Sequence, residues 1–175
     1  AQIMISGRPV PELFAGLDQE RLGRAQQVAF NEAHLRNINS RSINWTIVAW
    51  PDEAWSEALY GEPDLERLWA EVATAVRLDE DDPVAAWTAH VDRLEERARV
   101  LNERRFDAIR LSGPGTDLTV GLLAGSRWRT GAAESVSGRR HVVNLPTEEV
   151  FTSPDPARAD GVVRATKPLA LQGTI

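Results

Sequence analysis

Apolar residues along the chain recur with two periods, one typical of strands and one typical of helices. Short runs rich in β-branched and aromatic residues predict strands, and they lie at residues 2–6, 44–49, 107–112 and 117–123. Gly113-Pro114-Gly115 separates the last two runs and predicts a hairpin turn. Two further strand-like runs, "GVVRAT" and "PLALQGTI", close the chain.

The helical spacing of other apolar residues predicts three helices, at residues 18–37, 64–77 and 83–104. Asp18 is expected to cap the first helix, and Asp82 followed by Pro83 marks the start of the third. The third helix has an apolar seam made of Val84, Trp87, Val91, Leu94, Ala98 and Leu101. Because this seam is shorter than about three heptads, it indicates a packing face rather than a coiled coil. His90 lies off the seam, so we expect it to be exposed.

Strand and helical patterns alternate loosely along the chain, which predicts an α/β fold in which helices pack on a mixed sheet. Residues 125–140, "GSRWRTGAAESVSGRR", are loop-like and form the candidate boundary between domains. Both ends of the chain run through apolar, strand-like sequence, whereas the ends of domains are usually polar. We therefore expect the chain to be an internal fragment of a longer protein.

Composition narrows the classes of function. The net charge of −6 argues against a nucleic-acid-binding protein, which would normally carry a basic face. Cysteine is absent from the sequence, which excludes disulfides and thiolate metal sites. The apolar runs are all shorter than the ~18 residues of a membrane span, and no signal peptide is visible. We expect a cytoplasmic protein with neither a nucleic-acid nor a membrane partner.

Most of the usual catalytic patterns are missing from the sequence. It has no G-x-S-x-G nucleophile motif. Its histidines form no H-x-x-x-H or H-x-H pair, since they stand apart as His34, His90 and His141. Its six tryptophans could form a stacking platform, but apolar surroundings favour core packing for Trp45, Trp50, Trp69 and Trp87.

The adjacent acids Glu148 and Glu149, within "NLPTEEVFTSPD", are the strongest candidates for chemistry. They follow Pro146 and precede Val150, so we expect them to be partly buried and to need a partner. An extended backbone would point their side chains to opposite faces. From the residues alone, one of them could be a metal ligand or catalytic group, or the pair could cap the local backbone.

The run "NLPTEEVFTSPD", with "GPGTDLTVGL" before it and "DGVVRATKPLALQG" after it, resembles the aminopeptidase T / aminopeptidase S family of metallopeptidases. The segments "RLGRAQQ", "NWTIVAWP", "RLDEDDPVAAWTAH" and "LNERRFDAIRLSGPGTDLTVGL" also resemble the family, in family order, so the similarity covers essentially the whole chain. It implies that residues 1–130 are part of an N-terminal α/β domain. Residues 131–175 would begin a C-terminal, metal-binding catalytic domain that is truncated here.

The resemblance also implies a function. Members of this family are cytoplasmic, usually dimeric enzymes that remove N-terminal residues from peptides, with two divalent metal ions, typically zinc or cobalt. The P-T-E-E-V-F motif carries a glutamate ligand, which matches Glu149 rather than Glu148; the other ligands would lie beyond Ile175. We expect the isolated chain to be inactive. The competing interpretation is a non-catalytic scaffold or interaction module descended from such an enzyme.

Overall fold

The computed structural model describes residues 1–7 and 16–165. Contacts between residues divide the chain into two compact units. Unit 1 comprises Ala1–Asp92 and Gly131–Glu148, and unit 2 comprises Arg93–Thr130 and Glu149–Ile175. The division into domains at residues 1–130 and 131–175 concerns a longer protein, and it stays a prediction.

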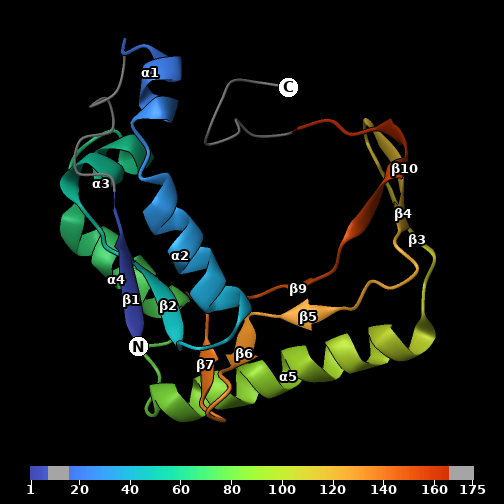
Figure 1. The fold of residues 1–175 in the computed structure, drawn as a ribbon. Helices are drawn as coiled ribbons and strands as arrows, with labels where there is room; N and C mark the ends of the chain where they lie inside the picture. Colours follow the sequence, from blue (N-terminus) through green and yellow to red (C-terminus); the bar gives the residue numbers. More distant parts are fainter. Residues whose placement is uncertain (8–15, 166–175) are drawn as a thin grey trace. The chain divides into compact units, whose positions relative to one another are not determined.

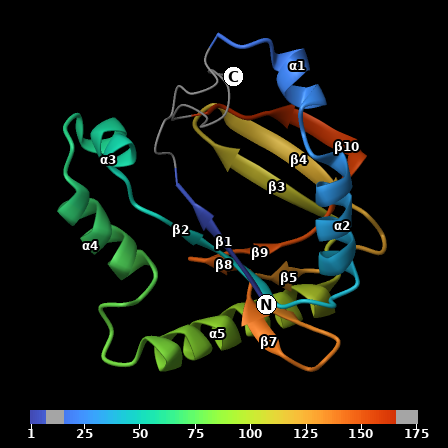
Figure 2. The same cartoon turned by 60° about the vertical axis from the view of Figure 1, so that its left-hand side comes forward.

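Unit 1 is built on a parallel sheet with the order β1-β2-β8 (Figures 1 and 2). Its strands are β1 (Gln2–Ser6), β2 (Trp45–Ala49) and β8 (Asn144–Leu145). Helices α1 (Gln19–Arg24) and α2 (Val28–Asn39) connect β1 to β2, as parallel strands require. Helices α3 (Glu53–Tyr60) and α4 (Leu65–Ala75) follow β2, and a small antiparallel sheet joins β6 (Ala132–Glu134) to β7 (Arg140–Val142).

Unit 2 contains an antiparallel sheet with the order β10-β4-β3. Strands β3 (Ala108–Gly113) and β4 (Thr116–Leu122) form the predicted hairpin, and β10 (Pro154–Val162) pairs with the other edge of β4. Two short strands, β5 (Arg129–Thr130) and β9 (Val150–Phe151), also pair in this unit. The α/β class is confirmed, but the described strands form separate parallel and antiparallel sheets rather than one mixed sheet.

Local signals located most elements correctly. All four principal strands lie within a residue or so of their predicted positions. Asp18 and Asp82 act as helix caps, since their carboxylates accept hydrogen bonds from the backbone of Arg21 and Ala85. The predicted strand at "GVVRAT" is realised only as the end of β10, and the one at "PLALQGTI" lies outside the described residues.

One helix prediction was wrong, and one helix was not predicted. The helix expected at residues 18–37 is two helices, with the break at residues 25–27, and the first of them contains the poor helix former Gly23. Helix α3 was not expected at all. It is short, it begins at an Asp52 cap and ends at the left-handed Gly61, and buried Ser56 connects it to α4 by accepting a hydrogen bond from Asp64 N.

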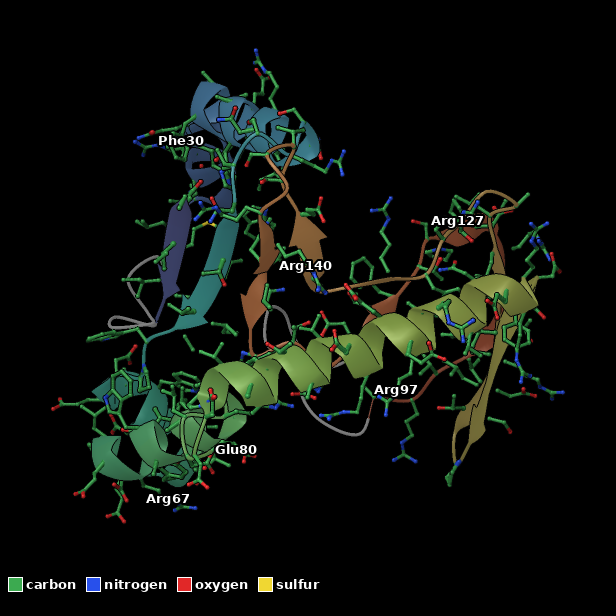
Figure 3. All side chains as sticks on the ribbon, turned by 90° about the horizontal axis from the view of Figure 1, so that it is seen from below. Phe30, Arg67, Glu80, Arg97, Arg127 and Arg140 are labelled. Atoms are coloured by element: carbon green, nitrogen blue, oxygen red, sulfur yellow. The ribbon has the colours of Figure 1, made fainter. Side chains whose placement is uncertain are left out.

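Helix α5 (Pro83–Arg104) supplies residues to both units. The middle of its predicted seam is buried at Val91, Leu94 and Ala98, whereas Val84 at the start is 77% exposed. His90 is buried, at 5% exposure, contrary to expectation. The buried face of α5 is wider than the predicted apolar seam, and it includes His90. On α2, in contrast, Phe30 points outward and is exposed (Figure 3).

In unit 2 an ion pair crosses the antiparallel sheet. Arg158 of β10 extends over Gly121 of β4, where an added Cβ would lie 2.8 Å from the arginine Nε. Its guanidinium binds the carboxylate of Asp107, and this hydrogen bond holds the pKa of Asp107 below its usual value. The absence of a side chain at Gly121 therefore allows Arg158 of β10 to extend across β4 and bind Asp107, which immediately precedes β3.

Within the described residues, no helix has the length and apolar character needed to cross a membrane.

Gly161 gives a test of the unit 2 sheet. It has φ = 125°, and a Cβ there would lie 2.8 Å from Leu118 Cα and closer still to the carbonyl oxygen of Asp117. We expect Gly161→Ala to destabilise the protein by about 2–4 kcal/mol, through backbone strain and overpacking. Gly125→Ala, which places its Cβ in open space, should change stability by less than about 0.5 kcal/mol. Chemical denaturation of both variants measures the difference, and equal stabilities would contradict the close approach of β10 to β4 at Gly161.

Candidate functional site

The predicted site residue Glu149 lies in a short irregular segment, residues 146–149, between β8 and β9. The segment begins with Pro146, whose peptide bond is cis. Both acids are exposed, contrary to the expected partial burial. The buried residue of the segment is instead Thr147, at 2% exposure. The division between units falls between Glu148 and Glu149.

Thr147 is buried against Gly131. A Cβ at Gly131 would lie 2.8 Å from both Cβ and Cγ2 of Thr147, so only glycine leaves room for the threonine. The hydroxyl of Thr147 is buried without a hydrogen-bond partner. The second stretch of unit 1, Gly131–Glu148, therefore packs at its start against its own end.

His90 binds the same segment from α5. Its Nε2 lies 2.9 Å from the carbonyl oxygen of Thr147 and 3.2 Å from Oε2 of Glu148. A carbonyl oxygen can only accept a hydrogen bond, so the hydrogen must be carried by Nε2. His90 thus donates to the backbone immediately before Glu148, while its ring meets Trp87 edge-on at 5.5 Å between centroids.

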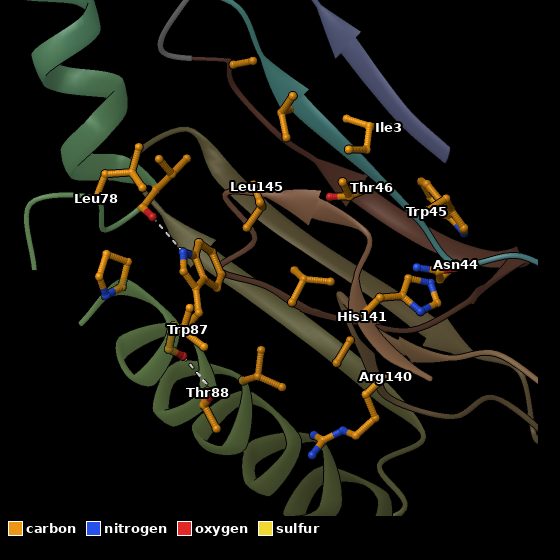
Figure 4. Close-up of a pocket in the computed structure, with 18 of the residues that line it drawn as sticks. Ile3, Asn44, Trp45, Thr46, Leu78, Trp87, Thr88, Arg140, His141 and Leu145 are labelled. Carbon is orange, nitrogen blue, oxygen red and sulfur yellow. Dashed lines mark hydrogen bonds between the residues drawn. The ribbon is translucent and has the colours of Figure 1, made fainter. Parts of the chain in front are cut away.

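Arg77, just after α4, binds the other oxygen of Glu148. Its Nη2 lies 2.7 Å from Glu148 Oε1, and its guanidinium carbon lies 4.5 Å from the ring centroid of Trp87. Trp87 in turn donates its indole N–H to the carbonyl of Val76 at 2.7 Å (Figure 4). Trp87 therefore contacts both the guanidinium of Arg77 and the ring of His90, and its hydrogen bond connects α5 to the end of α4.

Sequence reasoning missed both His90 and Arg77. A signal for His90 was present: it lies three residues after Trp87 and four before Leu94, which is the spacing of one helix face. No comparable signal marks Arg77, since its contact with Glu148 joins residues 71 positions apart.

A cleft of about 790 Å³ lies in unit 1 between the parallel sheet and helices α4 and α5 (Figure 4). Trp45, Trp69 and Trp87 line it, and Trp50 is 54% exposed, so these tryptophans are not the closed core that was expected. The rest of the lining is mainly aliphatic. His141 Nε2 is buried beside it without a hydrogen-bond partner.

A divalent metal ion would need several of these side chains as ligands. An exposed carboxylate such as that of Glu149 is a suitable donor for zinc. Among the described residues, however, no group of three histidine, cysteine, aspartate or glutamate side chains is placed to hold an ion. The described residues therefore fit the role of one ligand, and they do not form a complete metal site.

Comparisons with known proteins identify the relatives of this fold and segment. The model of the thermophilic metalloprotease (M29) family matches residues 1–175. Aminopeptidase T of Thermus aquaticus is 46% identical over 181 residues, which cover 100% of this chain and 44% of the relative. Aminopeptidase 2 of Geobacillus stearothermophilus is 36% identical, over 95% of this chain and 42% of the relative.

A solved structure, that of wild-type AmpT from Thermus thermophilus, is also similar. It superposes with a TM-score of 0.81 at 42% sequence identity, covering 98% of this chain and 43% of that one. These matches place the chain among the metalloproteases. More narrowly, it belongs to the thermophilic metalloprotease (M29) family, which confirms the resemblance seen in its motifs. The chain spans less than half the length of these relatives.

The contact between Gly131 and Thr147 can be tested by filling it. We expect Gly131→Ala to destabilise the protein by about 1–3 kcal/mol, because the new methyl group overpacks a buried site. Gly23→Ala, where a Cβ meets nothing, should be neutral or stabilising by up to about 1 kcal/mol, since alanine is the better helix former. Thermal unfolding of both variants checks this. A Gly131→Ala variant as stable as Gly23→Ala would show that Thr147 does not pack there.

Proposed function

We propose that this chain is part of a metal-dependent aminopeptidase, which hydrolyses N-terminal residues from peptides, and that Glu149 is one of its metal ligands. Membership of a metalloprotease family supports the metal, and the relatives' names support the aminopeptidase activity. Because the chain spans less than half of those relatives, the activity belongs to the longer protein.

The contacts of Glu148 carry the choice between the two acids. Each of its carboxylate oxygens already faces a nitrogen: Oε1 that of Arg77 and Oε2 that of His90. A carboxylate engaged in this way would have to break both contacts before it could bind a metal ion. Glu149, the next residue along the chain, is exposed, and it is the acid that matches the ligand position of the P-T-E-E-V-F motif.

In the longer protein we assign this chain to two parts. Residues 1–130 would belong to an N-terminal α/β domain, and residues 131–175 would begin the catalytic domain that holds two divalent ions, zinc or cobalt. Bound there, such ions polarise a peptide carbonyl and lower the pKa of a water molecule. The role of residues 146–149 is to hold one ligand in place, and the complete enzyme would be a homodimer.

A second candidate is a non-catalytic scaffold or interaction module. It is favoured by one observation: the described residues lack a group of three metal-binding side chains. The mass of the natural protein separates the two possibilities. A chain of the length of the relatives supports the enzyme, and a natural protein made of these 175 residues alone supports the scaffold.

The isolated chain should not hydrolyse peptides. A catalytic zinc site generally needs about three protein ligands, and the described residues offer no such group. Incubation of the 175-residue chain with leucine p-nitroanilide and zinc or cobalt should give no turnover above buffer. Activity that a chelator abolishes would show that the active site has been misplaced.

In the longer protein, Glu149→Gln should lose metal and sharply lower kcat, because the substitution keeps the shape of the side chain but removes the charge of a direct ligand. Loss of a residue that only supports a ligand costs about 10–100-fold in affinity or activity, so the loss at Glu149 should exceed this. Glu148→Gln should be the milder change.

Metal content and turnover of both variants decide the assignment. Near-normal metal occupancy and turnover in Glu149→Gln, together with an inactive Glu148→Gln, would reverse the roles of the two acids. Normal occupancy in both would remove this segment from the metal site altogether.

A further inference from the structure

Residues 146–149 lie outside any strand, yet they must hold a steady position if Glu149 is to meet a metal ion. A ligand that is fixed in advance loses less conformational freedom on binding than a mobile one. Backbone pairing of the kind that fixes β8 and β9 ends on either side of the segment. The question is therefore which side chains fix it.

We propose that His90 and Arg77 are positioning residues for Glu149: together they fix the carbonyl of Thr147 and the carboxylate of Glu148, and so set the direction of the chain at Glu149. This inference rests on the proposed role of Glu149 as a metal ligand. It assigns a function to two residues of the helical part of unit 1 that hold no metal themselves.

The geometry supports this role because the two contacts hold consecutive residues, one through its backbone carbonyl and the next through its side chain. His90 fixes the peptide unit between Thr147 and Glu148 through the Thr147 carbonyl. Arg77 then fixes the side chain that leaves the next Cα, that of Glu148. With the peptide unit and the side chain both held, φ and the side-chain torsions of residue 148 are restrained, and the Cα–C bond that leads to Glu149 leaves residue 148 in a fixed direction.

Both positioning groups are themselves held in place. His90 is 5% exposed, and its ring packs against Trp87. The side chain of Arg77 is 19% exposed, against 58% for that of Glu148, and its guanidinium stacks on the same tryptophan. The hydrogen bond from Trp87 to Val76 anchors the tryptophan to the residue that precedes Arg77. The more exposed acid, Glu148, is therefore the group that is positioned, and the less exposed His90 and Arg77 are the support.

The test uses the full-length protein and measures its affinity for zinc by competition with a chelator. His90→Phe keeps an aromatic ring but removes the N–H, and Arg77→Met keeps an unbranched apolar stem but removes the guanidinium and its charge. Each should weaken zinc binding by ~10–100-fold, the usual effect of losing a support of a metal ligand. The KM for peptide should change little, because neither residue is proposed to touch substrate.

Conservative variants and a matched control separate positioning from general stability. His90→Gln can still donate to the Thr147 carbonyl and should recover most of the affinity. Arg99→Met provides the control. Arg99 lies on α5, the helix that carries His90, and it makes exposed ion pairs with Glu96 and Glu103. It should leave zinc affinity unchanged while removing ion pairs from the helix surface.

A double-mutant cycle covers the case in which His90→Phe fails to fold. Arg77→Met and Glu148→Gln remove the two ends of one contact, so the double variant should bind zinc no more weakly than the poorer single variant. Wild-type zinc affinity in both Arg77→Met and Glu148→Gln, with only the melting temperature lowered, would overturn the positioning role. Wild-type affinity in Glu149→Gln would instead refute the proposed ligand, so the two failures are distinguishable.

Discussion

Unit 1 depends on the contact between two stretches of chain that are far apart in the sequence, residues 1–92 and 131–148. Closing so long a connection costs conformational entropy, which the contacts at the meeting point must offset. Those contacts follow one another along the second stretch. Gly131 receives Thr147, Ile47 N donates to Val143 O, β8 pairs with β2, and His90 donates to Thr147 O. The hydrogen bond from His90 is the last of them along the second stretch, next to the division between the units.

The features that sequence patterns predicted are those that neighbouring residues determine. A strand with β-branched residues, a hairpin at Gly113–Gly115 and an aspartate cap need only a few adjacent positions to be recognised. Helix α3 was missed because its eight residues hold too few turns for a clear period. The grouping of strands into separate sheets was also missed, because pairing between distant strands leaves no local mark.

The candidate site also combines features that neighbouring residues determine with features that depend on distant contacts. Glu149 could be proposed as a ligand because a motif of consecutive residues contains it, but the residues that contact the segment before it could not be predicted. His90 looks like a polar residue among charged neighbours until the returning segment covers it, and Arg77 meets Glu148 across 71 positions of sequence. The exposure of both acids could not be read from the sequence either, since proline and apolar neighbours are equally compatible with a surface turn.

Stability alone does not account for the support of this segment. An arginine with positive φ follows each of three helices: Arg77 follows α4, Arg41 follows α2 and Arg105 follows α5. Arg41 and Arg105 are exposed. Only at Arg77 among these three is the guanidinium largely covered, with Nη1 buried and unpaired. An unpaired buried donor costs about 1–3 kcal/mol, whereas an ion pair with an exposed partner such as Glu148 contributes only ~0–1 kcal/mol. The ion pair with Glu148 therefore offsets little of the cost of the unpaired donor. Arginine is better explained by what an apolar residue could not do, which is to hold the carboxylate of Glu148 in one orientation.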